Sequence, residues 1–291
     1  MNKRITISII TILIIIVIII WYTFTTKNKT IRYYSNENNE QQEKESYMVE
    51  DVYINNGDNK IYGMLYRPNT EEKAPIIIYS HGLGGNYSYG IDYAEELVKK
   101  GYAIYLFDFC GGSATSKSTG ETTEMSVLTE MSDLEAVLKE VKTWDFVDKI
   151  KITLFGTSQG GLVSSQVAAS HEQEIHGLIL FYPAFVISDD IHSKYPTKED
   201  IPEKENYMGW IEVSSKYMLD IYDMDFYKEV ENYKKEVLII HGDQDSIVDL
   251  KYSKQLNDIY QNSELKIIED AGHGFYGNSF QESLNYILEY L

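Results

Sequence analysis

The feature that most constrains the fold is a G-x-S-x-G motif at residues 156–160, between a predicted strand and a predicted helix. The strand is the apolar run at residues 152–155, and the helix is the run of small residues at 162–170. A sharp turn between two such elements needs small residues beside the serine, and glycine supplies them because it lacks a Cβ atom. Such a turn exposes the Ser158 hydroxyl and directs the backbone N–H of Gln159 toward an oxyanion on an attacked carbonyl. The alternative is a Gly/Ser turn in an unrelated α/β protein. Other motifs of the chain are needed to distinguish the two interpretations.

Apolar runs of strand length recur along the chain after residue 48, and several are separated by helical patterns such as residues 89–100 and 125–144. The first two runs flank a turn and predict a hairpin. The alternation of strands with helices predicts an α/β fold, with a mostly parallel eight-stranded sheet and helices on both faces. The predicted strands are residues 49–55, 60–66, 75–80, 102–109, 150–155, 177–182, 237–241 and 265–269.

One stretch, residues 184–233, breaks this alternation and is rich in tyrosine and charged side chains. Structureless loops of roughly fifty residues are uncommon in compact domains. We therefore expect an inserted lid, with short helices around residues 208–221. Aromatic side chains of this lid either line an acyl or aryl pocket or pack within the lid itself, and the sequence favours neither reading. The candidates are Tyr195, Tyr207, Trp210 and Tyr217.

The N-terminal segment departs from this globular composition. Residues 5–20 contain eleven isoleucines and no charged side chain, and aromatic residues follow them. A helix of about 20 residues spans the roughly 30 Å of bilayer hydrocarbon, where a helix satisfies its own backbone. We therefore expect residues 1–26 to be an uncleaved transmembrane signal anchor. A cleaved signal peptide is the alternative, although the apolar run is long and lacks a small-residue cleavage site.

The orientation of this segment depends on its flanking charges. Basic residues lie on both sides of it, so the positive-inside rule is close to a tie. We favour a cytoplasmic N-terminus, because a very short N-terminal tail is typical of a signal anchor. This predicts a single-pass protein of the cell membrane with its folded domain outside the cytoplasm. Residues 27–47 are predicted to be a polar spacer, and residues 48–291 to form the α/β domain.

Charge and cysteine content exclude several classes of function. The first 32 residues carry five basic side chains and no acidic one, so the remainder carries 21 basic against 45 acidic side chains, a net charge of −24. Such a domain is expected to avoid nucleic acid. The single cysteine, Cys110, excludes an internal disulfide. No His/Cys/Asp group has metal-ligand spacing, so we expect neither a metal nor another cofactor. The sequence leaves the oligomeric state open.

Acidic residues and a histidine follow the last two predicted strands. Asp243 and Asp245 come just after the strand at residues 237–241, and His273 follows the strand at residues 265–269. Functional sites of α/β sheets lie at the carboxyl ends of their strands, where Ser158 also lies. A serine hydroxyl needs a neighbouring base, and the base needs a partner that fixes its tautomer. Either aspartate can supply that partner.

These motifs together resemble the α/β-hydrolase superfamily over roughly residues 48–291, with the chain order Ser, Asp, His. More closely, the chain looks like serine aminopeptidase-like and monoacylglycerol lipase-like hydrolases, and cinnamoyl/feruloyl esterases are a near branch. The resemblance implies that Ser158 is the nucleophile, His273 the general base and Asp245 the acid, with Asp243 as the alternative. It also implies that the backbone N–H groups of Leu83 and Gln159 bind the oxyanion. The motifs that carry the resemblance are residues 81–85, 107–109, 156–161, 241–245 and 272–275.

The resemblance implies a membrane-anchored serine hydrolase that cleaves small or medium carboxylic esters through an acyl-enzyme. A serine aminopeptidase-like peptidase and a monoacylglycerol lipase are the enzyme alternatives. A catalytically inactive binding protein on the same fold is the alternative from another class, and it usually lacks one of the three side chains. Two departures from the family pattern put details in doubt: a loop beginning at Cys110 replaces a G-x-G-x-S-type loop, and Asp249 stands where proline is common.

Overall fold

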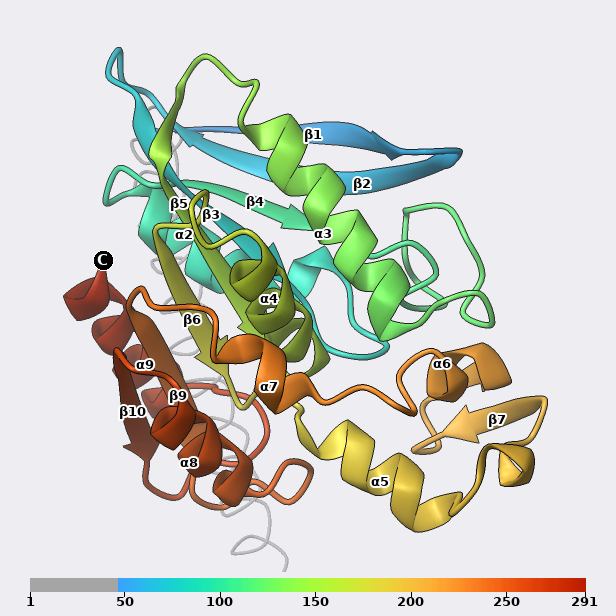
Figure 1. Ribbon diagram of the computed structural model, residues 1–291. Helices are drawn as coiled ribbons and strands as arrows, with labels where there is room; N and C mark the ends of the chain where they lie inside the picture. The colour runs from blue at the N-terminus through green and yellow to red at the C-terminus, as the bar shows by residue number, and fades with distance from the viewer. Residues whose placement is uncertain (1–46) are drawn as a thin grey trace, which may run out of the picture. The chain divides into compact units, whose positions relative to one another are not determined.

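A twisted eight-stranded sheet forms the centre of the described part of the chain, residues 47–291 of a computed structural model (Figure 1). The order of its strands is β1-β2-β4-β3-β5-β6-β9-β10. The strands are β1 (Tyr47–Asn56), β2 (Asn59–Pro68), β3 (Ala74–Ser80), β4 (Ala103–Phe107), β5 (Val147–Thr157), β6 (Gly177–Phe181), β9 (Val237–Gly242) and β10 (Ser263–Ile268).

The sheet is antiparallel only at one edge, where β1 and β2 form the predicted hairpin and β2 runs antiparallel to β4. All the remaining neighbours pair in parallel. Parallel strands in the middle of a sheet are covered on both faces, which explains why β3, β4, β6 and β9 read as continuous apolar runs. The predicted α/β fold with a mostly parallel sheet is confirmed.

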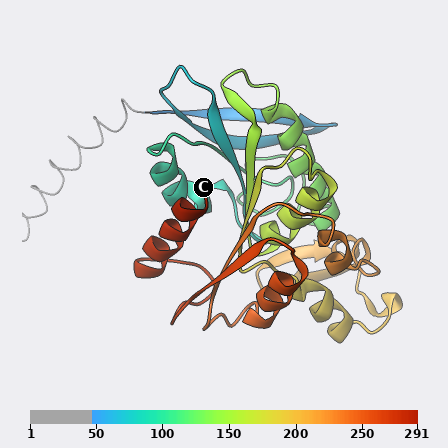
Figure 2. The same cartoon turned by 60° about the vertical axis from the view of Figure 1, so that its left-hand side comes forward.

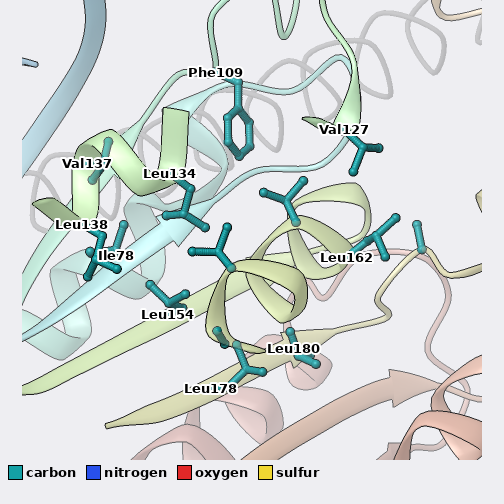
Figure 3. Close-up of a cluster of buried hydrophobic side chains, with 14 of the residues drawn as sticks. Ile78, Phe109, Val127, Leu134, Val137, Leu138, Leu154, Leu162, Leu178 and Leu180 are labelled. Atoms are coloured by element: carbon teal, nitrogen blue, oxygen red, sulfur yellow. The ribbon is translucent and has the colours of Figure 1, made fainter. Parts of the chain in front are cut away.

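Helices cover both faces of the sheet, and Figure 2 shows α2 and α9 together on one side. Side chains of β3 alternate between the two faces, because Ile76 and Ile78 join one apolar cluster whereas Ile77 and Tyr79 join the other. Figure 3 shows the first cluster, where Ile78, Leu154 and Leu180 of the sheet meet α3 and α4. The helices outside the lid are η1 (Tyr87–Gly90), α2 (Ile91–Val98), α3 (Val127–Val141), α4 (Gln159–Ser170), α8 (Leu250–Ile259) and α9 (Asn278–Tyr290).

The predicted lid, residues 184–233, lies beyond the carboxyl ends of the central strands (Figure 1). The expectation of short helices around residues 208–221 is wrong for most of that range. Met208 and Gly209 have φ angles of 54° and 75° and form the turn of a β-hairpin, so the chain becomes helical only at Ser215. The elements of the lid are α5 (Val186–Lys194), η2 (Lys198–Asp200), β7 (Lys204–Tyr207), β8 (Ile211–Ser214), α6 (Ser215–Leu219) and α7 (Phe226–Val230).

The predicted anchor at residues 1–26 and nearly all of the predicted spacer at 27–47 lie outside the described residues. Within residues 47–291, no helix has both the length and the apolar character that a membrane span requires. The anchor, the spacer and the domain boundaries therefore stay predictions.

Candidate active site

Ser158 occupies a strained turn between β5 and α4. Its φ and ψ angles are 53° and −120°, a conformation that L-residues rarely adopt. The flanking glycines are required by contact: a Cβ atom on Gly156 would lie 2.2 Å from the Gly160 carbonyl oxygen, and one on Gly160 would lie 2.3 Å from the Ser80 carbonyl oxygen. The turn therefore has the geometry that the G-x-S-x-G motif predicts.

His273 lies beside this serine and comes from the loop between β10 and α9. Its Nε2 atom is 3.1 Å from Ser158 Oγ, and its Nδ1 atom is 2.8 Å from Asp245 Oδ2. The ring of Tyr182 packs against the imidazole with a centroid distance of 4.4 Å. Because the carboxylate accepts from Nδ1–H, Nε2 is left free to accept the hydroxyl proton of Ser158.

The side chain of Asp245 is buried, and both of its oxygen atoms accept hydrogen bonds. Its Oδ1 atom accepts hydrogen bonds from the backbone N–H groups of Ile247 and Val248, at 2.8 and 2.9 Å. Burial alone raises the pKa of the Asp245 carboxyl, but hydrogen bonds from His241, His273 and the Val248 backbone outweigh it and hold the pKa well below its usual range. The Asp245 side chain is therefore an ionised carboxylate in the folded protein near neutral pH.

His241, at the end of β9, is a contact of this carboxylate that the sequence did not reveal. Its Nε2 atom lies 2.9 Å from the Val248 carbonyl oxygen and 3.3 Å from Asp245 Oδ2, and its Nδ1 atom lies 2.7 Å from Ser253 Oγ. The ring is completely buried. The only signal in the sequence is the spacing of four residues between His241 and Asp245, which also fits an ordinary turn.

Asp243, the alternative acid, lies elsewhere. Its Oδ1 atom accepts a hydrogen bond from the Asp270 backbone N–H at 2.8 Å, so it caps a turn and does not contact His273. Asp249, the residue at the position where proline is common, is the N-cap of α8 and accepts from the Lys251 backbone N–H. Geometry therefore favours Asp245 over Asp243 as the partner of His273.

Leu83 and Gln159, whose backbone N–H groups are the predicted oxyanion donors, line the same pocket as Ser158. Gln159 is the first residue of α4, where backbone N–H groups lack partners within the helix. Leu83 follows β3 in the loop that passes next to the serine, since a Cβ atom on Gly82 would lie 3.0 Å from Ser158 Cβ. Both residues therefore lie near the nucleophile, where oxyanion donors are expected.

His81 holds this loop and is not placed to act as a base. Its Nδ1 atom lies 2.8 Å from the Gly82 carbonyl oxygen, and its Nε2 atom accepts from the Phe109 backbone N–H at 3.2 Å. Acceptance at Nε2 fixes the proton on Nδ1. Burial lowers the pKa of His81, which keeps the imidazole neutral.

An apolar pocket lies beside Ser158, and most of its remaining lining comes from the lid. Of the four aromatic candidates, Tyr207 and Trp210 line this pocket. Tyr195 instead donates to Glu205, and Tyr217 is buried and donates to the Gln159 side chain. The lining residues are Leu83, Ser158, Gln159, Ala184, Val186, Ile187, Asp190, Tyr207, Met208, Trp210, Ile247 and Val248.

Among residues 47–291, no cluster of His, Cys, Asp and Glu has a geometry that holds a metal ion. The site brings together the Ser158 hydroxyl, the His273 imidazole and the buried Asp245 carboxylate. Fold and site define the chain as a serine hydrolase of the α/β-hydrolase class, as the motifs predict. Within that class, the chain belongs to the prolyl oligopeptidase family (Peptidase_S9), whose model matches residues 90–291.

Two curated relatives match parts of the chain. The quorum-quenching protein AidA of Acinetobacter baumannii (strain MDR-ZJ06) is 32% identical over 113 residues, which are 38% of this chain and 36% of AidA. The protein bem46 of Schizosaccharomyces pombe (strain 972) is 24% identical over 187 residues, which are 64% of this chain and 56% of bem46. The matches thus span between 36% and 56% of the length of these relatives.

Solved structures match about four fifths of this chain and almost the whole of their own length. Est1E from Butyrivibrio proteoclasticus, solved with ferulic acid bound, is 27% identical with a TM-score of 0.76, and the match covers 82% of this chain and 97% of Est1E. A monoacylglycerol lipase from Paleococcus ferrophilus is 20% identical with a TM-score of 0.60, covering 79% of this chain and 97% of the lipase. The second likeness speaks for the fold alone.

Proposed function

We propose that the protein is a serine esterase that cleaves small or medium carboxylic esters with Ser158, His273 and Asp245. The observation that carries this proposal is the continuous chain of hydrogen bonds from Asp245 through His273 to Ser158, a residue that lines an apolar pocket. Each of the three side chains has the partner that its role requires.

Acylation begins when Ser158 Oγ attacks the ester carbonyl carbon and His273 Nε2 takes its proton. The carbonyl electrons move onto oxygen, and the backbone N–H groups of Leu83 and Gln159 bind that oxyanion. Collapse of the tetrahedral intermediate re-forms the carbonyl and breaks the ester C–O bond. The departing alcohol takes the proton from His273, which leaves an acyl group on Ser158.

Deacylation repeats the same steps with water. His273 Nε2 removes a proton from a water molecule, and the hydroxyl oxygen attacks the acyl carbon. The second tetrahedral intermediate expels Ser158 Oγ, which recovers its proton from His273. The products are the carboxylic acid and the free enzyme, so the cycle consumes one water and needs no cofactor.

The pocket favours an apolar or aromatic group on one side of the ester. Tyr207 and Trp210 supply flat aromatic surface there, and Asp190 adds a carboxyl side chain to the lining. Est1E, 27% identical to this chain, binds ferulic acid, an aromatic acid. Aryl esters therefore belong in the first substrate panel beside alkyl esters of increasing acyl length.

Amide hydrolysis is the second candidate activity, because the family model that matches residues 90–291 is that of prolyl oligopeptidases. A monoacylglycerol lipase activity is the third, because the motifs of the chain also resemble those of monoacylglycerol lipase-like hydrolases. An ester and an amide of the same acyl group, with monoacylglycerols of several chain lengths, separate the three. A higher kcat/KM on the amide than on the matched ester would contradict the esterase proposal.

The direct test is a fluorophosphonate label on purified residues 33–291, followed by the substrate panel. The label forms a bond to an activated serine, so it should attach to Ser158 and be lost in Ser158→Ala. A protein that binds the panel compounds but neither takes the label nor turns them over would be the inactive binding protein.

Residues 5–24 are proposed to anchor the protein to the cell membrane, with the hydrolase domain outside the cytoplasm. Their apolar length and the lack of a convincing cleavage site support this. The full chain should resist extraction by high salt and carbonate but dissolve in detergent, and residues 33–291 should be soluble. Protease added to intact cells should reach the domain. A mature protein that begins near residue 25 and is free in the medium would contradict the anchor, and protection until lysis would contradict the orientation.

A further inference from the structure

The side chain of Gln159 lies in a buried polar network that the reaction does not use directly. Its Nε2 atom donates to Glu130 Oε2 of α3 at 2.8 Å, and its Oε1 atom accepts from the Tyr217 hydroxyl of α6 at 2.6 Å. The three side chains are at most 1% exposed. The network therefore joins the helix after the nucleophile, the long helix α3 and the lid.

This network holds both ends of the Gln159 amide. Tyr217 donates, so it selects the amide oxygen, and Glu130 accepts, so it selects the amide nitrogen. Gln159 Nε2 also donates a hydrogen bond to Met125 Sδ, at 3.8 Å. A side chain fixed at both ends also fixes the first turn of α4, whose leading N–H group is the proposed oxyanion donor.

Glu130 has the surroundings of a neutral acid. Within residues 47–291 its Oε1 atom has no hydrogen-bond partner, and no cationic side chain pairs with it. The pKa of Glu130 is raised to about 8, because burial, with a smaller contribution from the charge of Asp133, raises it by more than the hydrogen bond from Gln159 lowers it. The titratable groups that face it are Asp133 from α3 and Tyr217 from α6, while α4 offers the uncharged Gln159.

We propose that Glu130, carrying its proton, is a positioning residue that holds the oxyanion donor Gln159 in its catalytic geometry, together with Tyr217. This rests on the proposed function. Loss of the Glu130 proton would place a negative charge behind the oxyanion site, where it opposes the charge that forms on the substrate oxygen. The enzyme should therefore lose kcat when Glu130 ionises.

The test measures kcat and KM from pH 5 to pH 10, per active site titrated with a fluorophosphonate, so that unfolded protein is not counted. Glu130→Ala should lower kcat about tenfold with KM within about twofold, because the donor shifts while the substrate pocket stays. Glu130→Gln, a neutral side chain of the same shape, should recover most of that loss. It should also remove the fall in kcat of about tenfold that the unchanged enzyme shows above about pH 8.

Two further variants make the result specific. Glu135→Gln lies on the same helix at an exposed position, where Glu135 contacts His171, and it should keep the fall above pH 8. Tyr217→Phe removes only the hydroxyl that Gln159 accepts from, and it should lower kcat several-fold with little change in KM.

The inference is overturned if Glu130→Gln keeps the alkaline fall at the same pH, or if Glu130→Ala and Tyr217→Phe leave kcat unchanged. It is also overturned if Glu130→Ala and Tyr217→Phe raise KM without lowering kcat. If the activity depends on Ser158 but is unchanged by these substitutions, only this inference is overturned. Activity that survives Ser158→Ala overturns the proposed function and this inference with it.

Discussion

The loops around Ser158 and the outer side of the lid are held in different ways. The loops are fixed by short backbone turns and by buried hydrogen bonds, as when Asp245 accepts from two backbone N–H groups and from His273. The outer side of the lid is the part that carries exposed ion pairs, such as Lys198–Asp223 and Lys204–Glu212. Tyr207, which lines the pocket from the lid, has a buried hydroxyl without a partner in the described residues. Buried, satisfied groups give one fixed geometry, whereas exposed pairs contribute little.

This contrast predicts large rate effects at the loops and small effects in the lid. The largest is expected for Ser158→Ala, which removes the nucleophile and should lower kcat by about 10⁶-fold, as serine loss does in comparable triads. The measurement is kcat on the best ester of the panel, with fluorophosphonate labelling as the second readout. Labelling of another serine in this variant would show that the nucleophile is not the serine in the turn after β5.

The next effect distinguishes the two acids after β9. Asp245→Asn should preserve the fold but lower kcat on the order of 10⁴-fold, because an amide holds the His273 imidazole in the wrong tautomer. Asp243→Asn is the matched control, since Asp243 contacts the Asp270 backbone and not the imidazole. Its rate should fall far less. The reverse ranking, measured as kcat of the two purified variants, would show that the hydrogen bonds at Asp245 do not identify the acid.

The same contrast separates what the sequence could predict from what it could not. The turn at Ser158 and the placements of Asp245 and His273 follow from short motifs at strand ends, because the sheet fixes where those ends meet. The lid hairpin was missed, since β7 carries mostly polar residues and its turn depends on a positive φ at Met208. Gly209 beside it fits such a turn, but a glycine alone does not distinguish a hairpin from another loop.

The network around Gln159 was missed for a different reason. Glu130 lies 29 residues before Gln159 in the chain, and both are brought together only by the packing of α3 against α4. An acidic residue in an amphipathic helix is ordinarily read as solvated. Pairwise contacts of this kind depend on tertiary structure, so a single sequence carries no local signal of them.

A third prediction concerns stability and pH. The pKa of Glu130 is raised to about 8, so between about pH 4.5 and pH 8 the folded chain holds a proton that the unfolded chain releases. The free energy of unfolding therefore falls as pH rises through this window, at a slope of up to about 1.4 kcal/mol per pH unit. Glu130→Gln has no ionisable group at this position, so its free energy of unfolding lacks this pH dependence. Denaturant unfolding of both proteins at pH 5, 6.5 and 8 should show a widening advantage of the variant, and parallel curves would contradict a buried neutral acid.

Substitution at the inner side of the lid should change substrate affinity more than rate. Trp210 lines the pocket but is half-exposed, at 54%. Trp210→Ala should raise KM for an aryl ester about three- to tenfold with kcat nearly unchanged, because it removes apolar contact made equally in the ground state and the transition state. Leu219→Ala, an exposed lid residue outside the pocket lining, is the control. A fall in kcat with constant KM would instead give Trp210 a role in the transition state.

The smallest effect is expected at the outer side of the lid. Lys198 pairs with Asp223, and their side chains are 44% and 75% exposed. Exposed pairs of this kind contribute about 0–1 kcal/mol, because water and salt screen the attraction and ordering two long side chains costs entropy. Lys198→Met should therefore change the free energy of unfolding by less than about 1 kcal/mol and kcat/KM by less than about twofold, as measured by denaturant titration and by rates at low and high salt. A clear loss of kcat/KM that disappears in high salt would contradict this expectation. It would mean that the ion pairs of the lid act together to hold the pocket over Ser158, and that the lid is as firmly ordered as the loops.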